Sequence, residues 1–225
     1  MTEAGGFKAA IFDCDGTLVD SESIWIDMIQ DVLKESNLDS TERALEEFRG
    51  VTSTVAAEKI ANQAGGEANS IQTALDTEYS RRLRSVSVPM NSAVTFLRAF
   101  QREIPVAVAS NGRREDVVAL LTNAGLIEFI NEIVTIEDVE QGKPAPDLYV
   151  LACERLGVQT SQSVVFEDSI VGITAAKRAG CFVIGLGADA HIAEAADHRV
   201  PSFDHLGVES RNGEASIRVH TPEYF

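Results

Sequence analysis

Two aspartates separated by one residue, Asp13 and Asp15, have the type and spacing to do chemistry. They directly follow residues 7–12, a short apolar stretch that predicts a buried strand. Alternate side chains of an extended segment share a side, so both carboxylates can converge on one point. Carboxylates crowded at the end of a buried strand are costly unless positive charge lies between them, and Mg²⁺ bound through oxygens is the simplest such charge. The Asp-x-Asp-Gly-Thr pattern is also typical of a turn, in which Gly16 permits a sharp bend and Thr17 offers a hydroxyl and an N–H. The strand before the pattern and three later motifs disfavour the interpretation as a turn alone.

Those three motifs each follow an apolar run. Residues 110–112 (Ser-Asn-Gly) combine a hydroxyl, an amide and the start of a helix, which indicates an anion site, although Ser and Asn are also common helix caps. Lys143 lies on a stiff loop with two prolines, where a fixed ammonium could neutralise phosphate and carboxylate charge; most lysines, however, are simply solvated. Glu167 and Asp168 follow a further strand, although an acid pair also favours the dipole of a helix start. Together the four motifs predict two acid pairs, one lysine and one anion site around a single crevice.

The elements that must position these residues alternate between strands and helices. Apolar runs predict strands, and amphipathic stretches that commonly end at a glycine predict helices of about ten residues between them. This alternation predicts an α/β fold, a doubly wound parallel sheet whose ligands bind at the carboxyl ends of the strands. The predicted strands are residues 7–12, 104–109, 132–136, 163–166, 181–186 and, more weakly, 198–203.

A helical module interrupts this pattern after the first strand. Four helical stretches follow one another from about residue 21 to residue 83 without a strand signal. We therefore expect an α/β core made of residues 1–17 and 89–206, an inserted all-helical cap of residues 18–88, and a polar C-terminal tail of residues 207–225. Both ends of the insert lie near the end of the first strand, so it can cover the crevice.

Composition restricts the partners. The formal net charge of −16 argues against a binder of DNA or RNA, but a local cationic pocket could still hold a small anionic substrate. No apolar run is long enough to span a membrane, and the first six residues lack a signal-peptide pattern. Three cysteines are an odd, sparse count that fits unpaired thiols. We expect a cytoplasmic protein, monomeric by default, with no nucleic-acid or membrane partner.

The combined motifs resemble those of the haloacid dehalogenase-like (HAD) hydrolase superfamily, and within it the β-phosphoglucomutase-like group of sugar phosphatases and mutases. The resemblance covers roughly residues 7–206. It implies that Asp13 is a nucleophile that takes a phosphoryl group as an aspartyl phosphate, and that Asp15 protonates the leaving oxygen and then activates water. It further implies one Mg²⁺ held by Asp13, the backbone carbonyl of Asp15 and Asp168, with Glu167 as an outer or alternative ligand. The residues expected to hold the phosphate are Thr17, Ser110, Asn111 and Lys143.

Departures from the group's pattern favour a phosphatase over a mutase. β-Phosphoglucomutases carry a cap histidine where Trp25 stands, and an arginine for the distal phosphate where Ser53 stands. Arg49, on the same loop, either compensates in part or is a surface arginine; Glu22 and Arg49 are the cap residues expected to contact substrate. The opening motif also resembles that of sugar-phosphate and 6-phosphogluconate phosphatases. We expect a Mg²⁺-dependent phosphatase of a small sugar phosphate or phosphogluconate-like monoester; the alternatives are a β-phosphoglucomutase-type mutase and, with less support, a non-catalytic binding protein.

Overall fold

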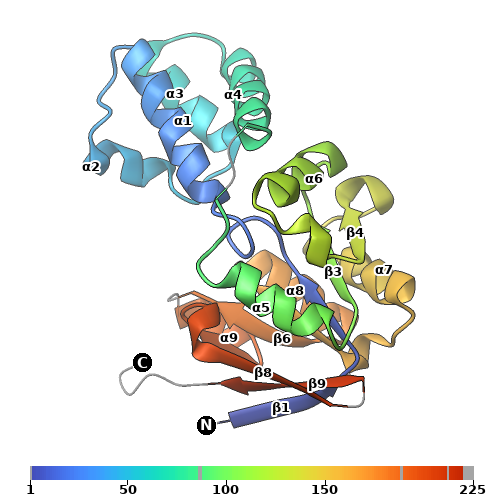
Figure 1. Ribbon diagram of the computed structural model, residues 1–225. Helices are drawn as coiled ribbons and strands as arrows, with labels where there is room; N and C mark the ends of the chain where they lie inside the picture. Colours follow the sequence, from blue (N-terminus) through green and yellow to red (C-terminus); the bar gives the residue numbers. More distant parts are fainter. Residues whose placement is uncertain (1, 86–87, 188–189, 212, 220–225) are drawn as a thin grey trace. The chain divides into compact units, whose positions relative to one another are not determined.

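The computed structural model describes residues 2–85, 88–187, 190–211 and 213–219. The chain forms two compact units (Figure 1). The α/β unit comprises Met1–Val19 and Pro89–Phe225, and the helical unit comprises Asp20–Val88. None of the helices in the described part of the chain has both the length and the hydropathy needed to cross a membrane.

Six parallel strands form the main sheet of the α/β unit, in the order β4-β3-β2-β5-β6-β7. The strand β2 is central, and the chain continues to β3 on one side of it and later to β5 on the other. The crevice of a doubly wound sheet lies at this reversal of strand order, outside the carboxyl ends of the strands. The predicted fold class is confirmed. The strands are β2 (Ala9–Phe12), β3 (Val106–Ser110), β4 (Glu132–Thr135), β5 (Ser163–Glu167), β6 (Phe182–Leu186) and β7 (His198–Val200).

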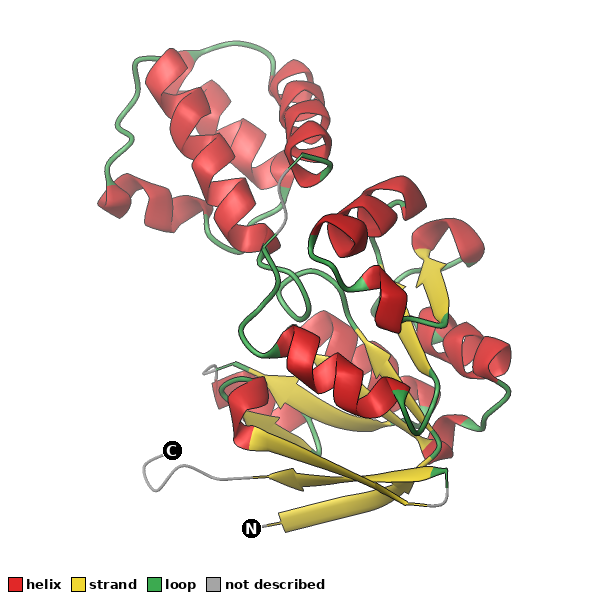
Figure 2. Ribbon diagram, in the orientation of Figure 1, coloured by secondary structure: helices red, strands yellow, loops and turns green. Residues whose placement is uncertain are grey.

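Helices pack on both faces of this sheet (Figure 2). The period of two along a strand divides the core: Phe12 and Phe166 lie on the face covered by α5, while Ile11 and Val165 lie on the face covered by α7 and α8. The helices are α5 (Ala93–Gln101), α6 (Arg114–Asn123), α7 (Asp147–Leu156), α8 (Ile170–Ala179) and α9 (Ala190–Ala195), with short 3₁₀ turns η2 (Ile127–Phe129), η3 (Ile136–Asp138), η4 (Thr160–Gln162) and η5 (Phe203–His205).

A second, antiparallel sheet joins the two ends of the chain in the order β1-β9-β8 (Figure 1). Its strands are β1 (Thr2–Phe7), β8 (Leu206–Arg211) and β9 (Glu214–Val219). Residues 207–225 were expected to form a polar tail of uncertain structure, and the described part of this segment instead contributes the strands β8 and β9. The strand predicted over residues 7–12 combines the last residue of β1 with β2. A signal was present: Ala215, Ile217 and Val219 alternate with polar residues and are buried, which is the pattern of a half-buried strand. Gly213, between β8 and β9, has a φ of 78°, as tight hairpin turns require.

The helical unit consists of α1 (Ser21–Glu35), α2 (Glu42–Leu45), η1 (Glu46–Phe48), α3 (Ser53–Ala64) and α4 (Ala68–Leu83). Side-chain caps begin the two helices α1 and α3: Asp20 accepts a hydrogen bond from Ser23 N, and Thr52 accepts one from Val55 N. Gly65, with a φ of 80°, ends α3. The unit has its own apolar core, formed by residues from α1 through α4.

The carboxylate of Asp138 connects several elements of the α/β unit through hydrogen bonds and ion pairs. Its carboxylate accepts hydrogen bonds from Thr135 N at 2.8 Å and Arg155 Nη2 at 2.9 Å, and it pairs with Arg114, so it joins η3 to α6 and α7. Partial burial raises the pKa of Asp138, but hydrogen bonds from Arg155, Thr135 and Arg114 outweigh it and hold the pKa well below the usual range.

Asp138→Ala is therefore expected to lower the free energy of unfolding by about 2 kcal/mol at neutral pH. A depressed native pKa stabilises the fold above the ordinary carboxyl pKa, and this contribution is lost as the pH falls through the native value. Urea unfolding of both proteins at about pH 7 and about pH 3 should show a smaller difference at the lower pH. A difference that does not change with pH would contradict the role assigned to the carboxylate.

Candidate active site

Asp13 lies where β2 ends, beside the end of β5. Phe12 and Phe166 are directly paired neighbours in the sheet, with ring centroids 4.6 Å apart, so the residues that follow them lie side by side. These residues are Asp13 and Glu167, and both are buried. The stacked pair Phe12 and Phe166 thus fixes the positions of the Asp13 and Glu167 carboxylates at the carboxyl ends of β2 and β5.

Lys143 is the cation of this site. Its side chain is only 4% exposed, and its Nζ forms ion pairs with Asp13 Oδ1 and, at 2.7 Å, with Glu167 Oε1. Burial opposes the charge of Lys143, but Asp13 and Glu167, with Tyr149, raise its pKa well above the ordinary value. The lysine is therefore a buried, fixed ammonium and not a solvated surface residue.

Both carboxylate oxygens of Glu167 accept hydrogen bonds. Its Oε1 also accepts a hydrogen bond from the hydroxyl of Tyr149 at 2.9 Å. Its Oε2 accepts from both the backbone N–H and the hydroxyl of Ser169, each at 2.9 Å. Gly172 packs so closely that a Cβ there would collide with the carboxylate. Because both oxygens are already engaged, Glu167 is better placed to orient Lys143 than to bind a metal directly.

Tyr149 and Ser169 are functional candidates that the sequence analysis missed. Tyr149 is fully buried in α7, six residues after Lys143, and nothing in the sequence indicated that its hydroxyl would meet Glu167. Ser169 was quoted only as part of a motif, and it also caps α8 through Gly172 N.

A divalent cation fits the group formed by Asp13, Glu167 and Asp168, whose carboxylate oxygens all lie within 4.8 Å of one another. Burial, then the charge of Glu167, raises the pKa of Asp168 to about 7, although the hydroxyl of Thr17 donates to it at 2.9 Å. Burial also raises the pKa of Asp13, and Lys143 only partly opposes this. Three carboxylates against one ammonium leave uncompensated negative charge, and an oxygen-ligand set is what Mg²⁺ prefers. Of the three, Glu167 already has both carboxylate oxygens engaged by donors.

Asp15 and Ser110 face each other from the ends of β2 and β3. The hydroxyl of Ser110 donates to Asp15 Oδ2 at 3.4 Å and accepts from Gly112 N at 2.9 Å. Asp15 is partly exposed, whereas Ser110 and Thr17 are buried. Gly16, with a φ of 78°, turns the chain so closely past Asp168 that a Cβ would overlap its carboxylate.

Asn111, expected to contact phosphate, contacts the Lys143 loop: its Oδ1 accepts from Lys143 N at 2.9 Å and its Nδ2 donates to Lys143 O at 3.3 Å. The structure therefore brings together residues from all four predicted motifs in the α/β unit.

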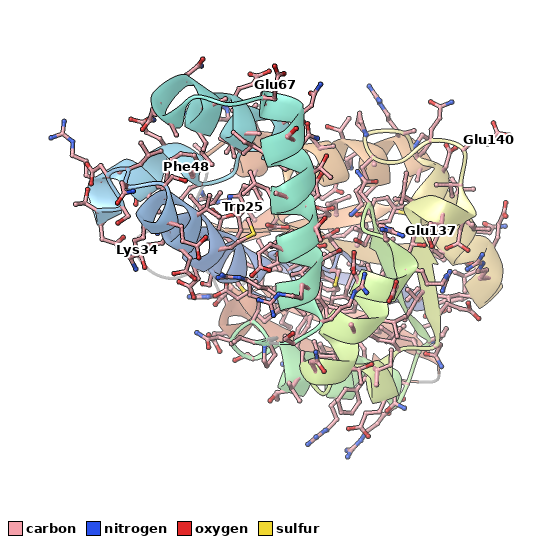
Figure 3. All side chains as sticks on the ribbon, turned by 90° about the horizontal axis from the view of Figure 1, so that it is seen from above. Trp25, Lys34, Phe48, Glu67, Glu137 and Glu140 are labelled. Carbon is pink, nitrogen blue, oxygen red and sulfur yellow. The ribbon has the colours of Figure 1, made fainter. Side chains whose placement is uncertain are left out.

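The remaining candidates belong to the helical unit. Glu22 Oε1 accepts a hydrogen bond from Gly50 N at 3.1 Å, which ties the start of α1 to the loop that carries Arg49. Arg49 pairs with Glu46 at 3.1 Å, and its side chain is 41% exposed. Trp25 is buried, and its Nε1 donates to Phe48 O at 2.9 Å; both residues are labelled in Figure 3. Trp25 is thus a core residue, and contact of Glu22 and Arg49 with substrate stays a prediction.

Comparison with known proteins identifies a family. Residues 10–186 match the family described as haloacid dehalogenase-like hydrolase. The validoxylamine A 7'-phosphate phosphatase of Streptomyces hygroscopicus subsp. limoneus is 32% identical over 191 residues, which are 84% of this chain and 89% of that protein. The fructose-1-phosphate phosphatase YqaB of Escherichia coli K12 is 32% identical over 176 residues, 77% of this chain and 93% of that protein. A solved HAD family hydrolase of Deinococcus radiodurans R1, with bound phosphate and sodium, superposes with a TM-score of 0.73 at 30% identity, covering 88% of this chain and 93% of that one.

Proposed function

We propose that this chain, which belongs to the haloacid dehalogenase-like hydrolase family and is a hydrolase of phosphoric monoesters, is a Mg²⁺-dependent phosphatase of a small sugar phosphate or phosphogluconate-like metabolite. The observation that carries the proposal is the Asp13 carboxylate, buried at the end of β2 and fixed by Lys143 beside Asp168. The two phosphatases named above act, by their names, on small organic phosphates, one of them a sugar phosphate.

The first step of the proposed reaction transfers the phosphoryl group to Asp13. A carboxylate oxygen of Asp13 forms a bond to phosphorus as the bond to the leaving oxygen breaks, and Asp15 gives its proton to that oxygen. Ser110 and Lys143 hold the oxygens of the transferred group, because phosphoryl transfer depends on positioning and on stabilisation of charge. Mg²⁺, when bound by Asp13 and Asp168 with the backbone carbonyl of Asp15, supplies charge neutralisation at the same group.

The second step returns the enzyme to its starting state. Asp15, now ionised, takes a proton from water as the water oxygen bonds to phosphorus and the bond from phosphorus to Asp13 breaks. Inorganic phosphate leaves, Asp13 is again a carboxylate, and Asp15 is again protonated. Asp15 therefore needs to change its protonation state within each cycle.

The helical unit favours water over a second sugar as the acceptor. At the position of the mutase cap histidine, Trp25 is packed in the core and hydrogen-bonded to Phe48. At the position of the arginine for the distal phosphate stands Ser53, the first residue of α3. A mutase has to hold a bisphosphate intermediate at both ends, and neither residue supplies a cation for that.

The experiment that tests the proposal is phosphate release, with Mg²⁺, from a panel of phosphorylated metabolites. The panel contains hexose and pentose phosphates, 6-phosphogluconate, phosphoglycolate, glycerol phosphate and nucleotides. Preference for sugar phosphates or 6-phosphogluconate supports the proposed substrate class. Preference for nucleotides, or activity only as a mutase of β-glucose 1-phosphate with a bisphosphate primer, would overturn it.

Removal of divalent metal is expected to stop turnover. Without the metal ion, Lys143 is the cation that the described residues place in ion pairs with this group of crowded carboxylates, Asp13, Glu167 and Asp168. EDTA should abolish phosphate release, and added Mg²⁺ should restore it whereas added Na⁺ should not. Unchanged rates after chelation would exclude a metal requirement.

Tyr149→Phe removes one hydroxyl from the group that holds Glu167 and leaves the ring in place. We expect kcat to fall by about tenfold, as is usual for residues that orient the groups in contact with a substrate or metal. Ser163→Ala is the matched control, because Ser163 lies in the same strand as Glu167 and the change also deletes a buried hydroxyl. That hydroxyl donates to Gln159 O at 3.3 Å. Equal kcat values for the two variants would mean that the hydroxyl of Tyr149 has only a structural role.

A further inference from the structure

The carboxamide of Asn111 links the loop after β3 to the loop before α7. Asn111 follows β3, and Lys143 lies 32 residues later on the loop before α7. The two bonds of the carboxamide, from Lys143 N to Oδ1 and from Nδ2 to Lys143 O, go to one residue's backbone. A planar amide bonded through both ends fixes position and direction at once.

Gly142 packs closely against this link. A Cβ added at Gly142 would lie 2.5 Å from Asn111 Oδ1 and 2.6 Å from Ile136 Cδ1, which is closer than real Cβ contacts. Gly142 has no positive φ, so close approach to Asn111 is the structural reason for a glycine there. The carboxamide of Asn111 thus lies close to the backbone just before Lys143.

Anchoring the backbone of Lys143 has a consequence at the other end of its side chain. A lysine carries its charge on a flexible four-carbon chain, so the ammonium is located only when its Cα is located. The Nζ of Lys143 is buried between Asp13 and Glu167. From the far side, Arg178 donates to Pro144 O at 3.0 Å, so the loop is held by Arg178 on one side and Asn111 on the other.

We propose that Asn111 is a positioning residue: its carboxamide fixes the backbone of Lys143 so that the ammonium reaches Asp13 and the transferred phosphoryl group, and its side chain does not itself bind phosphate. This role rests on the phosphatase function proposed above. This role differs from the contact with phosphate expected from the sequence: Oδ1 and one N–H of Nδ2 are engaged by the backbone of Lys143, and the double-mutant cycle below tests whether the second N–H contacts the substrate.

A double-mutant cycle with Lys143 separates the two roles. Asn111→Ala should lower kcat by about 10- to 100-fold in the wild-type background, the cost typical of a displaced reacting group. In a Lys143→Met background the same change should cost less than about twofold, because the group that Asn111 positions is gone. An activated aryl phosphate keeps the slow variants measurable. An equal cost in both backgrounds would show that Asn111 acts on the substrate directly and would overturn the proposal.

Two further variants check the result of the double-mutant cycle. Gly142→Ala keeps every polar group but pushes on the carboxamide, and it should show the same dependence on Lys143 as Asn111→Ala. Asn131→Ala is the matched control: its Oδ1 accepts from Val106 N at 2.8 Å, a similar link at the opposite end of β3, and kcat should not change. A fall in kcat with Asn131→Ala equal to that with Asn111→Ala would mean a general loss of stability.

Hydrogen exchange gives a readout that does not depend on turnover. The Lys143 amide, which donates to Asn111 Oδ1, should exchange faster in Asn111→Ala and in Gly142→Ala than in the wild type. Unchanged exchange would overturn the link itself. If the wild-type protein released no phosphate while the exchange changed as expected, the proposed function would fail and the link between the loops would stand. If the wild-type protein released phosphate and the double-mutant cycle showed that the cost of Asn111→Ala does not depend on Lys143, only the positioning role would fail.

Discussion

Asp13→Asn is expected to lower phosphate release by at least about 10⁴-fold, a loss typical of removing a covalent nucleophile. The amide has nearly the shape of the carboxylate but is a much poorer nucleophile, and it weakens the pairing with Lys143. Release should be measured under single-turnover conditions with Mg²⁺ and the best substrate of the panel. Thermal unfolding of the same sample checks that the fold is kept.

Asp197→Asn is the matched control for this change. Asp197 also pairs with a lysine, since both its oxygens lie 2.7 Å from Lys177 Nζ, but it stands before β7 and outside the site. The control should keep full turnover. Appreciable turnover by Asp13→Asn, with both proteins folded, would remove Asp13 as the nucleophile.

Lys143→Met is expected to lower kcat by about 10²- to 10³-fold, the usual effect of losing one fixed stabilising charge. Methionine retains much of the side-chain volume at this buried position but leaves Asp13 and Glu167 without their ammonium. Lys143 lowers the pKa of Asp13, so its loss raises that pKa further, and the acidic limb of the kcat/KM profile should move to higher pH.

The control for the lysine is Lys177→Met, which removes a 41% exposed ammonium from the pair with Asp197. Its pH profile should match the wild type. If Lys143→Met lowered kcat without moving the acidic limb, the ammonium would stabilise the reacting group but would not control the ionisation of Asp13.

The strands could be predicted from the sequence because a buried parallel strand is an apolar run, and β2, β3, β5 and β6 each carry one. The end of such a strand is a fixed place in the fold, so acids and hydroxyls that directly follow it can be located without coordinates. Asp13, Ser110 and Glu167 were located in this way.

Contacts that depend on how helices and loops pack could not be predicted. The hydroxyl of Tyr149 reaches Glu167 only because α7 packs against β2, β3 and β4 with one particular rotation, and no spacing in the sequence encodes that rotation. Asn111 matched an anion-binding pattern, yet its carboxamide turns to a loop 32 residues away. The strands β8 and β9 were missed because their alternation is short and polar residues surround it.

The most direct test of the central claim is to trap the phosphoryl group on Asp13. Asp15→Asn removes the proton donor and the base, but an aryl phosphate has a leaving group that needs no proton, so the first step proceeds and the second stalls. Peptide mapping by mass spectrometry after rapid acid quench should find one phosphoryl group on the peptide containing Asp13, and none when Asp13→Asn is added. Release of the aryl alcohol with no phosphoryl group on the protein, or with the group on another residue, would contradict transfer through Asp13.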